Sequence, residues 1–229
     1  MLIILINIKE CSRIGAIQFP YYKNTPHSII CYTIADLIEK SFNVEDNLNH
    51  GLQLTTKEKQ FFNEHFERTE LKKKDLLIKE REKERYLSFI ENGIMRYWTA
   101  NMRLREITFW FSFSNKFANS YLSLMHSKPS AFNIQALCDS VVWRIKANDL
   151  AVLYDRSMNT NRIARIVLEN VFTRKITREI SLLKLSPEDR YKELVRSYKE
   201  LILTILLKYL ASYIGITPQA LSRIRRRIY

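Results

Sequence analysis

Four polar side chains near the C-terminal end have the types and the spacing needed to hydrogen-bond the edges of base pairs. Gln219, Ser222, Arg223 and Arg226 recur at i, i+3, i+4 and i+7, so on an α-helix they share one face. Arginine can donate to guanine O6 and N7, glutamine can pair with adenine N6 and N7, and serine can bond to either base. No acidic residue follows Glu200 in the sequence. The pattern predicts a helix that reads double-stranded DNA.

The preceding residues predict the second helix that such a reading helix needs as a support. Residues 207–227 read LKYLASYIGITPQALSRIRRR. Gly215 can adopt the positive φ that ends a first helix, Thr217 offers a hydroxyl as N-cap, and Pro218 suits the first position of a second helix. Apolar side chains recur at helical spacing on the inner faces, at Leu210, Ile214, Leu221, Ile224 and Ile228. These offsets predict a helix-turn-helix, with a solvent-exposed helical hairpin as the ordinary alternative.

Composition agrees with a folded protein that binds a polyanion. Of the 229 residues 46% are hydrophobic, and only 4 glycines and 5 prolines occur, which argues against disordered and fibrous chains. The net charge is +13 at pH 7, the isoelectric point is about 9.7, and most of the surplus lies after Leu150. A basic C-terminal region attracts nucleic acid through counterion release, so the charge supports a DNA partner.

Cysteine and histidine are too few and too scattered to predict a metal site. Cys11, Cys31 and Cys138 lie far apart without a C-x-x-C pair, which favours a reducing compartment. A cupin-type enzyme would need clustered histidine and carboxylate ligands, but the predicted strand region holds one histidine, His126. The apolar opening MLIILIN is too short to span a bilayer and lacks the features of a secretion signal. We expect a cytoplasmic protein that is not an enzyme, with no metal, no cofactor and no membrane partner.

The middle of the chain predicts a domain rich in β-strands. After an N-terminal extension of unknown role (1–33), helices are expected at 34–42 and from Thr55 or Thr56, and a strand at 76–78. Between Tyr86 and Ile145 the apolar residues alternate, as in Ile107 to Phe113, 132–136 and 141–145. YLSFIENGIMRYW predicts a hairpin that turns at residues 91–93. Short strands at this spacing predict a sandwich, barrel or jelly roll.

Beyond Ala147 the pattern becomes helical. Asn148 and Asp149 can cap a short helix, and a long apolar helix is expected over 156–185. Two surfaces could cover the apolar side of this helix equally well, namely its own copy in a two-fold dimer or its own strand-rich domain. Ser186-Pro187-Glu188 then begins a new helix that leads into the helix-turn-helix.

Three motifs, YLSFIENGIMR, SPEDRY and KYLASYIGITPQALSRIRR, resemble the Crp/Fnr superfamily of bacterial transcription regulators, with the last most similar to regulators of the Bacteroides lineage. The resemblance covers residues 34–229 and implies an α+β fold. Its parts are a β jelly-roll, cyclic-nucleotide-binding-like sensor domain (34–155), a long dimerisation helix (156–185) and an all-α helix-turn-helix domain (186–229). It further implies a homodimer whose recognition helices lie ~34 Å apart. In that family pattern Gln219, Ser222 and Arg223 match base-reading positions, Thr217 matches a phosphate-contacting one, and RNA polymerase can be a further partner.

The sensor half departs from the family pattern. Where cyclic-nucleotide-binding members carry a Gly-Glu pair this chain has Asn119 and Ser120, and where they carry an Arg-Ser pair it has Ser130 and Ala131. Cyclic AMP would lose charge-assisted hydrogen bonds worth about 1.5–3 kcal/mol each, so we do not expect it as the ligand. Asn119, Ser120, Ser130 and Asn133 could line a polar pocket for an unknown small-molecule effector, although ordinary loop and surface roles are commoner for such residues.

The sequence therefore predicts a sequence-specific, dimeric DNA-binding transcription regulator that acts on an inverted-repeat operator and is not controlled by cyclic AMP. The alternative is a small-molecule sensor whose ligand, bound in the strand-rich domain, switches DNA binding. A non-specific nucleic-acid coat is a weaker alternative, because a capped pair of helices is more than a coat requires.

Overall fold

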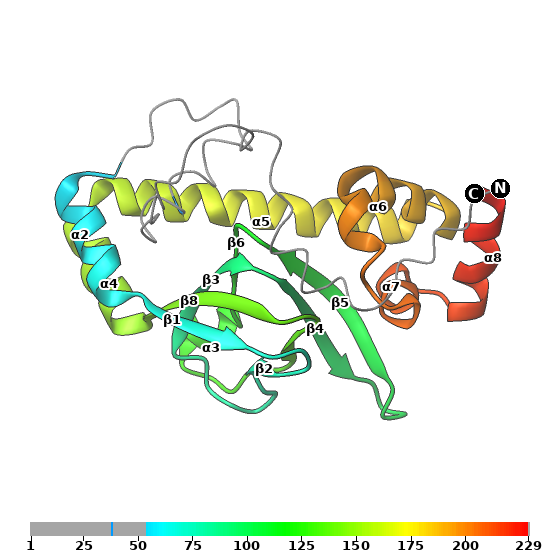
Figure 1. Cartoon of the computed structure of the whole chain (residues 1–229), viewed down its shortest axis with the longest axis horizontal. Coiled ribbons are helices and arrows are strands. Elements are labelled where there is room, and N and C mark those ends of the chain that lie inside the picture. Colours follow the sequence, from blue (N-terminus) through cyan, green and yellow to red (C-terminus); the bar gives the residue numbers. More distant parts are fainter. Residues whose placement is uncertain (1–37, 39–53, 229) are drawn as a thin grey trace, which may run out of the picture.

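The structure is a computed structural model that describes Ile38 and residues 54–228, and its centre is a sandwich of two four-stranded antiparallel sheets (Figure 1). The first sheet contains β1 (Glu67–Leu71), β8 (Ser140–Lys146), β3 (Tyr86–Asn92) and β6 (Lys116–Ala118), in that order. The second contains β2 (Leu76–Ile78), β7 (Asn133–Ala136), β4 (Ile94–Ala100) and β5 (Glu106–Phe113). Consecutive strands alternate between the two sheets except at β4 and β5. Eight strands in this order form a jelly roll, so the predicted class of fold is confirmed.

The core of the sandwich comes from side chains that point inward from both sheets. Ile90 and Val142 are fully buried from the first sheet, and Met95 and Ile134 from the second. Ile90 lies opposite Val142 in the β3–β8 pairing, and Ile134 lies opposite Tyr97 in the β4–β7 pairing. Alternating inward residues on facing sheets are what a sandwich core requires.

The predicted hairpin around residues 91–93 is wrong. β3 and β4 follow one another in the chain but lie in different sheets, because β3 pairs with β6 and β8 while β4 pairs with β5 and β7. Gly93 marks the crossing: its φ is +130°, and a Cβ atom there would lie 2.1 Å from Ser140 Oγ. An alternating pattern with a glycine turn fits a hairpin and a corner between sheets equally well, so the sequence could not distinguish them.

Several elements differ from those expected. Strands β1 and β6 and the short helix α3 (Tyr121–His126) were not predicted, since β1 carries mostly polar, exposed residues and β6 is only three residues long. The helix α4 (Ala147–Arg156) begins after Lys146, so Asn148 and Asp149 lie inside its first turn and do not cap it.

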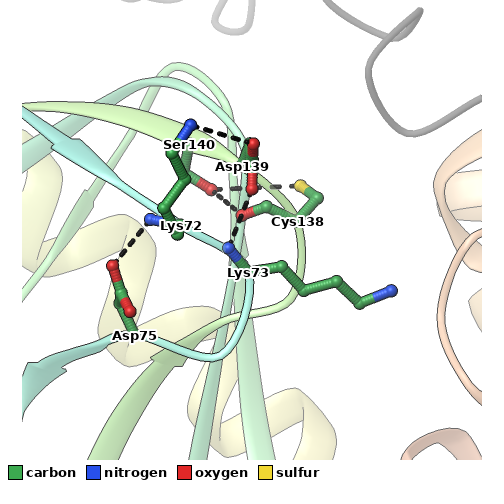
Figure 2. Close-up of polar contacts among 6 residues, drawn as sticks. All are labelled: Lys72, Lys73, Asp75, Cys138, Asp139 and Ser140. Atoms are coloured by element: carbon green, nitrogen blue, oxygen red, sulfur yellow. Dashed lines mark hydrogen bonds and ion pairs between the residues drawn. The ribbon is translucent and has the colours of Figure 1, made fainter.

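A turn rich in lysine joins β1 to β2 and is fixed to the connection between β7 and β8 (Figure 2). Asp139 accepts hydrogen bonds from the Lys73 backbone N–H (2.9 Å) and from Lys72 Nζ (3.3 Å), and Asp75 accepts one from the Lys72 N–H (2.7 Å). The hydrogen bond from the Lys73 backbone is the main cause that lowers the pKa of the Asp139 carboxyl. The charged residues here thus form an exposed turn.

Two helices begin at a shared group of polar side chains. Thr55 and Glu58 form a capping box at the start of α2 (Thr56–His65), and Ser157 caps the 27-residue helix α5 (Met158–Lys184). Glu58 also accepts hydrogen bonds from the Ser157 hydroxyl and from Asn159 Nδ2 (3.3 Å). Burial alone would raise the pKa of Glu58, but these hydrogen bonds outweigh it and the pKa is lowered.

The long helix α5 runs along the whole sandwich, with α2 and α4 at one end and the C-terminal helices at the other (Figure 1). Its first part packs on the sandwich, where Ile163 and Ile166 are buried with residues of α2 and α4. Farther along, a row of apolar side chains is exposed, and we call it the α5 stripe: Leu168, Phe172, Ile176, Ile180 and Leu183. The chain's own strand-rich domain therefore covers only the first part of α5. The α5 stripe is left for another surface, such as a second copy of the helix.

The remaining helices are α6 (Pro187–Ile202), α7 (Leu207–Ile214) and α8 (Pro218–Ile228). These three helices share one apolar core with the end of the sandwich closest to them. In this core Phe111, Phe113 and Cys138 pack with buried residues such as Tyr191 and Leu210. The expected N-terminal extension and, apart from Ile38, the expected helix at 34–42 lie outside the described residues. Among the described helices, none has the length and the apolar character needed to cross a bilayer.

Candidate nucleic-acid interface

The turn between α7 and α8 has the geometry that the sequence predicts. Gly215 ends α7 with φ +85°, and the backbone N–H groups of Gly215 and Ile216 donate to the Ala211 carbonyl oxygen at 3.0 and 2.9 Å. Thr217 Oγ1 accepts a hydrogen bond from the Ala220 N–H (3.2 Å), and Pro218 is the first residue of α8. The predicted cap, turn glycine and helix start are confirmed, so the two helices are held at a defined angle.

The inner side of this pair is a closed apolar core. Leu210, Ala211 and Leu221 are fully buried, Ile214 is 2% exposed and Ile224 is 5% exposed. Because these residues face inward, the opposite side of α8 faces solvent. Gln219, Arg223 and Arg226 are exposed and Ser222 is half-buried, and their helical spacing puts them on that side; Thr217 is exposed at the start of α8. The structure thus brings four of the five predicted DNA-binding residues to one accessible face and the fifth to its end, while their role in binding DNA remains a prediction.

The arginines at the end of α8 have different surroundings. Arg227 lies 3.7 Å from Glu188 of α6, and Glu188 also pairs with Lys192 at 2.9 Å. The hydrogen bond from Lys192 is the main cause that lowers the pKa of Glu188. Among the described residues, neither Arg223 nor Arg226 forms an ion pair. Their charges are therefore accessible to a phosphate or a base, whereas that of Arg227 is partly neutralised.

Two arginines attach the helix-turn-helix to the rest of the molecule. Arg178 of α5 donates to the Tyr213 carbonyl oxygen (2.9 Å), and its guanidinium carbon lies 4.4 Å from the centre of the Tyr213 ring. Arg190 of α6 donates to the carbonyl oxygens of Ile214 (3.0 Å) and Leu185 (2.6 Å). Since α5 and α6 hold α7 at several points, the exposed face of α8 has a defined direction relative to α5.

The predicted pocket residues in the sandwich bond mainly to their own chain. The Ser130 hydroxyl lies 2.9 Å from the Ser120 hydroxyl, and Asn133 Oδ1 accepts a hydrogen bond from the Glu80 N–H (2.9 Å). Ser120, Ser130 and Asn133 are buried, whereas Asn119 is half-buried. The structure thus brings Ser120 and Ser130 into contact at the N-terminal end of α3. Whether any of the four binds a ligand remains a prediction.

A buried carboxylate next to this group was not predicted. Glu84 is 4% exposed, accepts hydrogen bonds from the backbone N–H groups of Arg85 and Tyr86 (both 3.1 Å), and lies 3.5 Å from the Ser120 N–H. Burial raises the pKa of Glu84, although these hydrogen bonds and Arg144, 3.8 Å away, act in the opposite direction. No spacing rule points to Glu84, because its partners come from three separate segments.

Comparison with known proteins agrees with this architecture. A family model described as the cyclic nucleotide-binding domain matches residues 68–157. No curated protein matches the sequence. Among solved structures, FixK2 from Bradyrhizobium japonicum has a TM-score of 0.64 at 14% identity, with 71% of this chain and 84% of that chain covered. A protein described as a Crp/Fnr-family transcriptional regulator from Eubacterium rectale has a TM-score of 0.62 at 18% identity, with 76% and 83% covered. The c-di-GMP-responsive regulator CLP from Xanthomonas campestris has a TM-score of 0.59 at 14% identity, with 74% and 89% covered.

These matches define the class of fold. The sandwich, with the helix that follows it, is similar to a cyclic nucleotide-binding domain. With the long helix and the helix-turn-helix added, the chain has the fold of the Crp/Fnr transcription regulators, which confirms the predicted resemblance. The identities are low, so the likeness establishes the fold and leaves the finer similarity to the Bacteroides lineage a prediction.

Proposed function

We propose that this protein is a sequence-specific transcription regulator that binds an inverted-repeat DNA operator as a homodimer. The observation that carries the proposal is the exposed face of α8, where Gln219 and Arg223 project beside Ser222 from a helix with a fully apolar inner side. Such side chains on the second helix of a helix-turn-helix can donate to and accept from base edges in the major groove. A regulator of this kind acts where the chromosome lies, in the cytoplasm.

The homodimer is supported by the α5 stripe. Phe172 is 66% exposed and Leu183 is 82% exposed, and both lie on the same side of α5 as Ile176 and Ile180. Exposed apolar residues gathered along a helix mark an interaction site more often than a solvated surface. A second α5 pairing through this stripe would place two copies of α8 side by side, which suits an inverted repeat.

Control by cyclic AMP is not part of the proposal. The carboxylate of Glu84 already lies close to the Ser120 N–H, and Ser120 and Ser130 bond to each other. A phosphate entering there would have to displace Glu84 or lie beside its carboxylate, and it would meet no guanidinium from residue 130 or 131.

The alternative, a sensor whose ligand switches DNA binding, is favoured by one observation at the junction of β6 with α5. Arg174 Nε is buried there without a hydrogen-bond partner among the described residues, and its charge helps to lower the pKa of Lys116. The guanidinium carbon of Arg174 lies 6.0 Å from the centre of the Trp110 ring. An anionic small molecule would be stabilised by these groups. A thermal-shift screen of anionic metabolites tests this, because a ligand at about 100 times its Kd stabilises by about 2.7 kcal/mol.

Selection of random duplex DNA by the purified protein, followed by sequencing, tests the first proposal. We expect enrichment of an inverted repeat whose half-site centres lie about 10 base pairs apart. Arg223→Ala should lose the preference at one position of each half-site, whereas Arg156→Ala, an exposed arginine at the far end of α4, should keep the wild-type motif. Binding without any enriched sequence would contradict sequence-specific regulation. Transcription reconstituted on the selected operator then tests for contact with RNA polymerase and shows the direction of control.

A further inference from the structure

We propose that the stack of Arg96, in the sandwich, on Tyr209, in α7, positions the recognition helix and thereby sets the operator spacing that the dimer accepts. The inference rests on the proposed function and goes beyond it, because neither residue lies on α8. Both belong to the surface where α7 packs on β5.

That surface is an edge of a sheet. β5 is the outermost strand of the second sheet, so every other backbone N–H along its free side lacks a neighbouring strand. The Thr108 N–H donates instead to Ser212 Oγ of α7, at 2.8 Å. Thr108 is only 1% exposed, so α7 covers the edge at this point. A helix that satisfies a buried backbone donor cannot shift without leaving that donor unpaired.

Arg96 forms a rigid platform beside this contact. Its side chain is 1% exposed; Nε donates to Thr108 Oγ1 and Nη2 to Glu106 Oε2, both at 2.8 Å. With the guanidinium fixed on β4 and β5, its central carbon lies 3.7 Å from the centre of the Tyr209 ring. A planar, buried cation held by hydrogen bonds is well suited to stack on an aromatic ring.

The contact reaches α8 through the core of the helix-turn-helix. Tyr209 and Ser212 lie on the side of α7 that faces the sandwich, while Leu210 and Ile214 lie in the core shared with α8. On its other side α7 is attached to α5 by Arg178, which donates to the Tyr213 carbonyl oxygen. Attachments in different directions, to the sandwich on one side and to α5 and α6 on the other, fix a helix in position, and weakening one side lets it pivot. Moving α7 would carry α8 with it.

The consequence concerns spacing. Two recognition helices held rigidly in a dimer match one separation of half-sites, and a wrong separation must distort the protein or the DNA. Without the Arg96–Tyr209 stack, each helix-turn-helix keeps its attachments to α5 and α6, while its contact with the sandwich is reduced to the Thr108–Ser212 hydrogen bond and apolar packing, so it gains freedom to pivot. The dimer should then accept other separations, and it should bind the correct operator less tightly because the gained freedom must be given up on binding.

The test uses the full-length protein and the operator obtained by selection, together with the same operator carrying one base pair inserted or removed at its centre. For the wild type we expect at least tenfold weaker binding to both altered operators, measured by fluorescence anisotropy. Tyr209→Leu should bind the original operator several-fold more weakly and should discriminate less than threefold among the three. Tyr209→Phe keeps the ring and should behave as the wild type does.

Tyr86→Leu is the matched control. The Tyr86 ring also stacks on a guanidinium, that of Arg144 at 4.2 Å, but within the first sheet and away from α7. This variant should keep the wild-type spacing preference, which separates positioning from a general loss of stability. Arg96→Met combined with Tyr209→Leu should relax the spacing discrimination no more than Arg96→Met alone does, because Arg96→Met already removes the stack together with the hydrogen bonds to Thr108 and Glu106.

Unchanged discrimination in Tyr209→Leu, or tighter binding to the original operator, would overturn the inference while the proposed function stood. Additive effects of the two substitutions would also overturn it. Failure of the wild type to select any operator would instead refute the proposed function, and this inference with it.

Discussion

Substitution of Phe172 by alanine should separate the proposed dimer into single chains. Phe172 is 66% exposed in the single chain and lies in the middle of the α5 stripe. A phenylalanine side chain buries roughly 200 Å² when covered, so about 130 Å² is available for a partner and about 100 Å² of it would be lost in alanine. At about 25 cal/mol per Å² this amounts to about 2.5 kcal/mol for each chain and about 5 kcal/mol for the dimer.

This figure is an upper estimate, because some of the area stays covered by neighbouring side chains after the change. Taking half of it gives about 2.5 kcal/mol, which still raises the dissociation constant of the dimer by about 60-fold. Sedimentation velocity over a range of protein concentrations measures that constant directly. Thr177→Ala is the control, because Thr177 is exposed on a different side of α5 and its loss should leave the dimer unchanged.

An equal dissociation constant for the wild type and Phe172→Ala would refute the reasoning, as would a wild type that stays monomeric at micromolar concentrations. Either result would mean that something other than a second α5 covers the stripe. DNA binding by Phe172→Ala at low concentration should fall with dimerisation, because each half-site contact alone is weak.

Three other predictions follow from single side chains. Arg223→Ala should weaken operator binding by about 1–3 kcal/mol and relax the preference at one position of each half-site, and equal affinity for operators altered only there would verify the assignment. Burial, together with the charge of Arg174, lowers the pKa of Lys116 to about 8. Between that pKa and the ordinary value of 10.5 the unfolded chain binds the additional proton, so Lys116 disfavours folding most below pH 8 and its penalty falls as pH rises. Lys116→Met should therefore raise the melting temperature more at pH 7 than at pH 10, and an equal gain at both values would contradict the assignment. Gly93→Ala should destabilise the fold by about 2 kcal/mol or more in urea unfolding, because the new Cβ atom would meet Ser140 Oγ at a positive φ, and Ser140→Gly should restore part of the loss.

The helix-turn-helix could be predicted from the sequence because its determinants are local. Gly215, Thr217 and Pro218 each act within a few residues of their own position, and the structure has all three in the expected geometry. The jelly roll could be predicted as a class, since alternation fixes which side chains face inward. The crossing at Gly93 could not, because β3 and β4 do not pair with each other, and β3 finds its partners β6 and β8 only later in the chain.

Long-range polar contacts were likewise not predictable. Arg96 lies on a strand and Tyr209 on a helix, and neither position in the sequence indicates that they stack. Glu84 resembles any surface glutamate in a charged segment, yet its side chain is fully buried beside Ser120. The predicted DNA-binding residues reached a common face because one helix carries most of them. The residues of a ligand site assembled from separate loops come from different segments of the chain, so no single helical pattern indicates that they meet.

Arg190 has a consequence for how the C-terminal region opens. Its guanidinium donates to the carbonyl oxygens of Leu182 (3.4 Å) and Leu185 (2.6 Å) at the end of α5 and of Ile214 (3.0 Å) at the end of α7. Carbonyl groups at the end of a helix ordinarily find separate partners, so each end can fray by itself. Here the single guanidinium of Arg190 serves both helix ends. If Arg190 moves away from the end of α5, the carbonyl oxygen at the end of α7 loses its donor as well. The last turns of α5 and α7 should therefore exchange their amide hydrogens as a single cooperative unit, which makes the joint between the long helix and the helix-turn-helix open all at once or not at all.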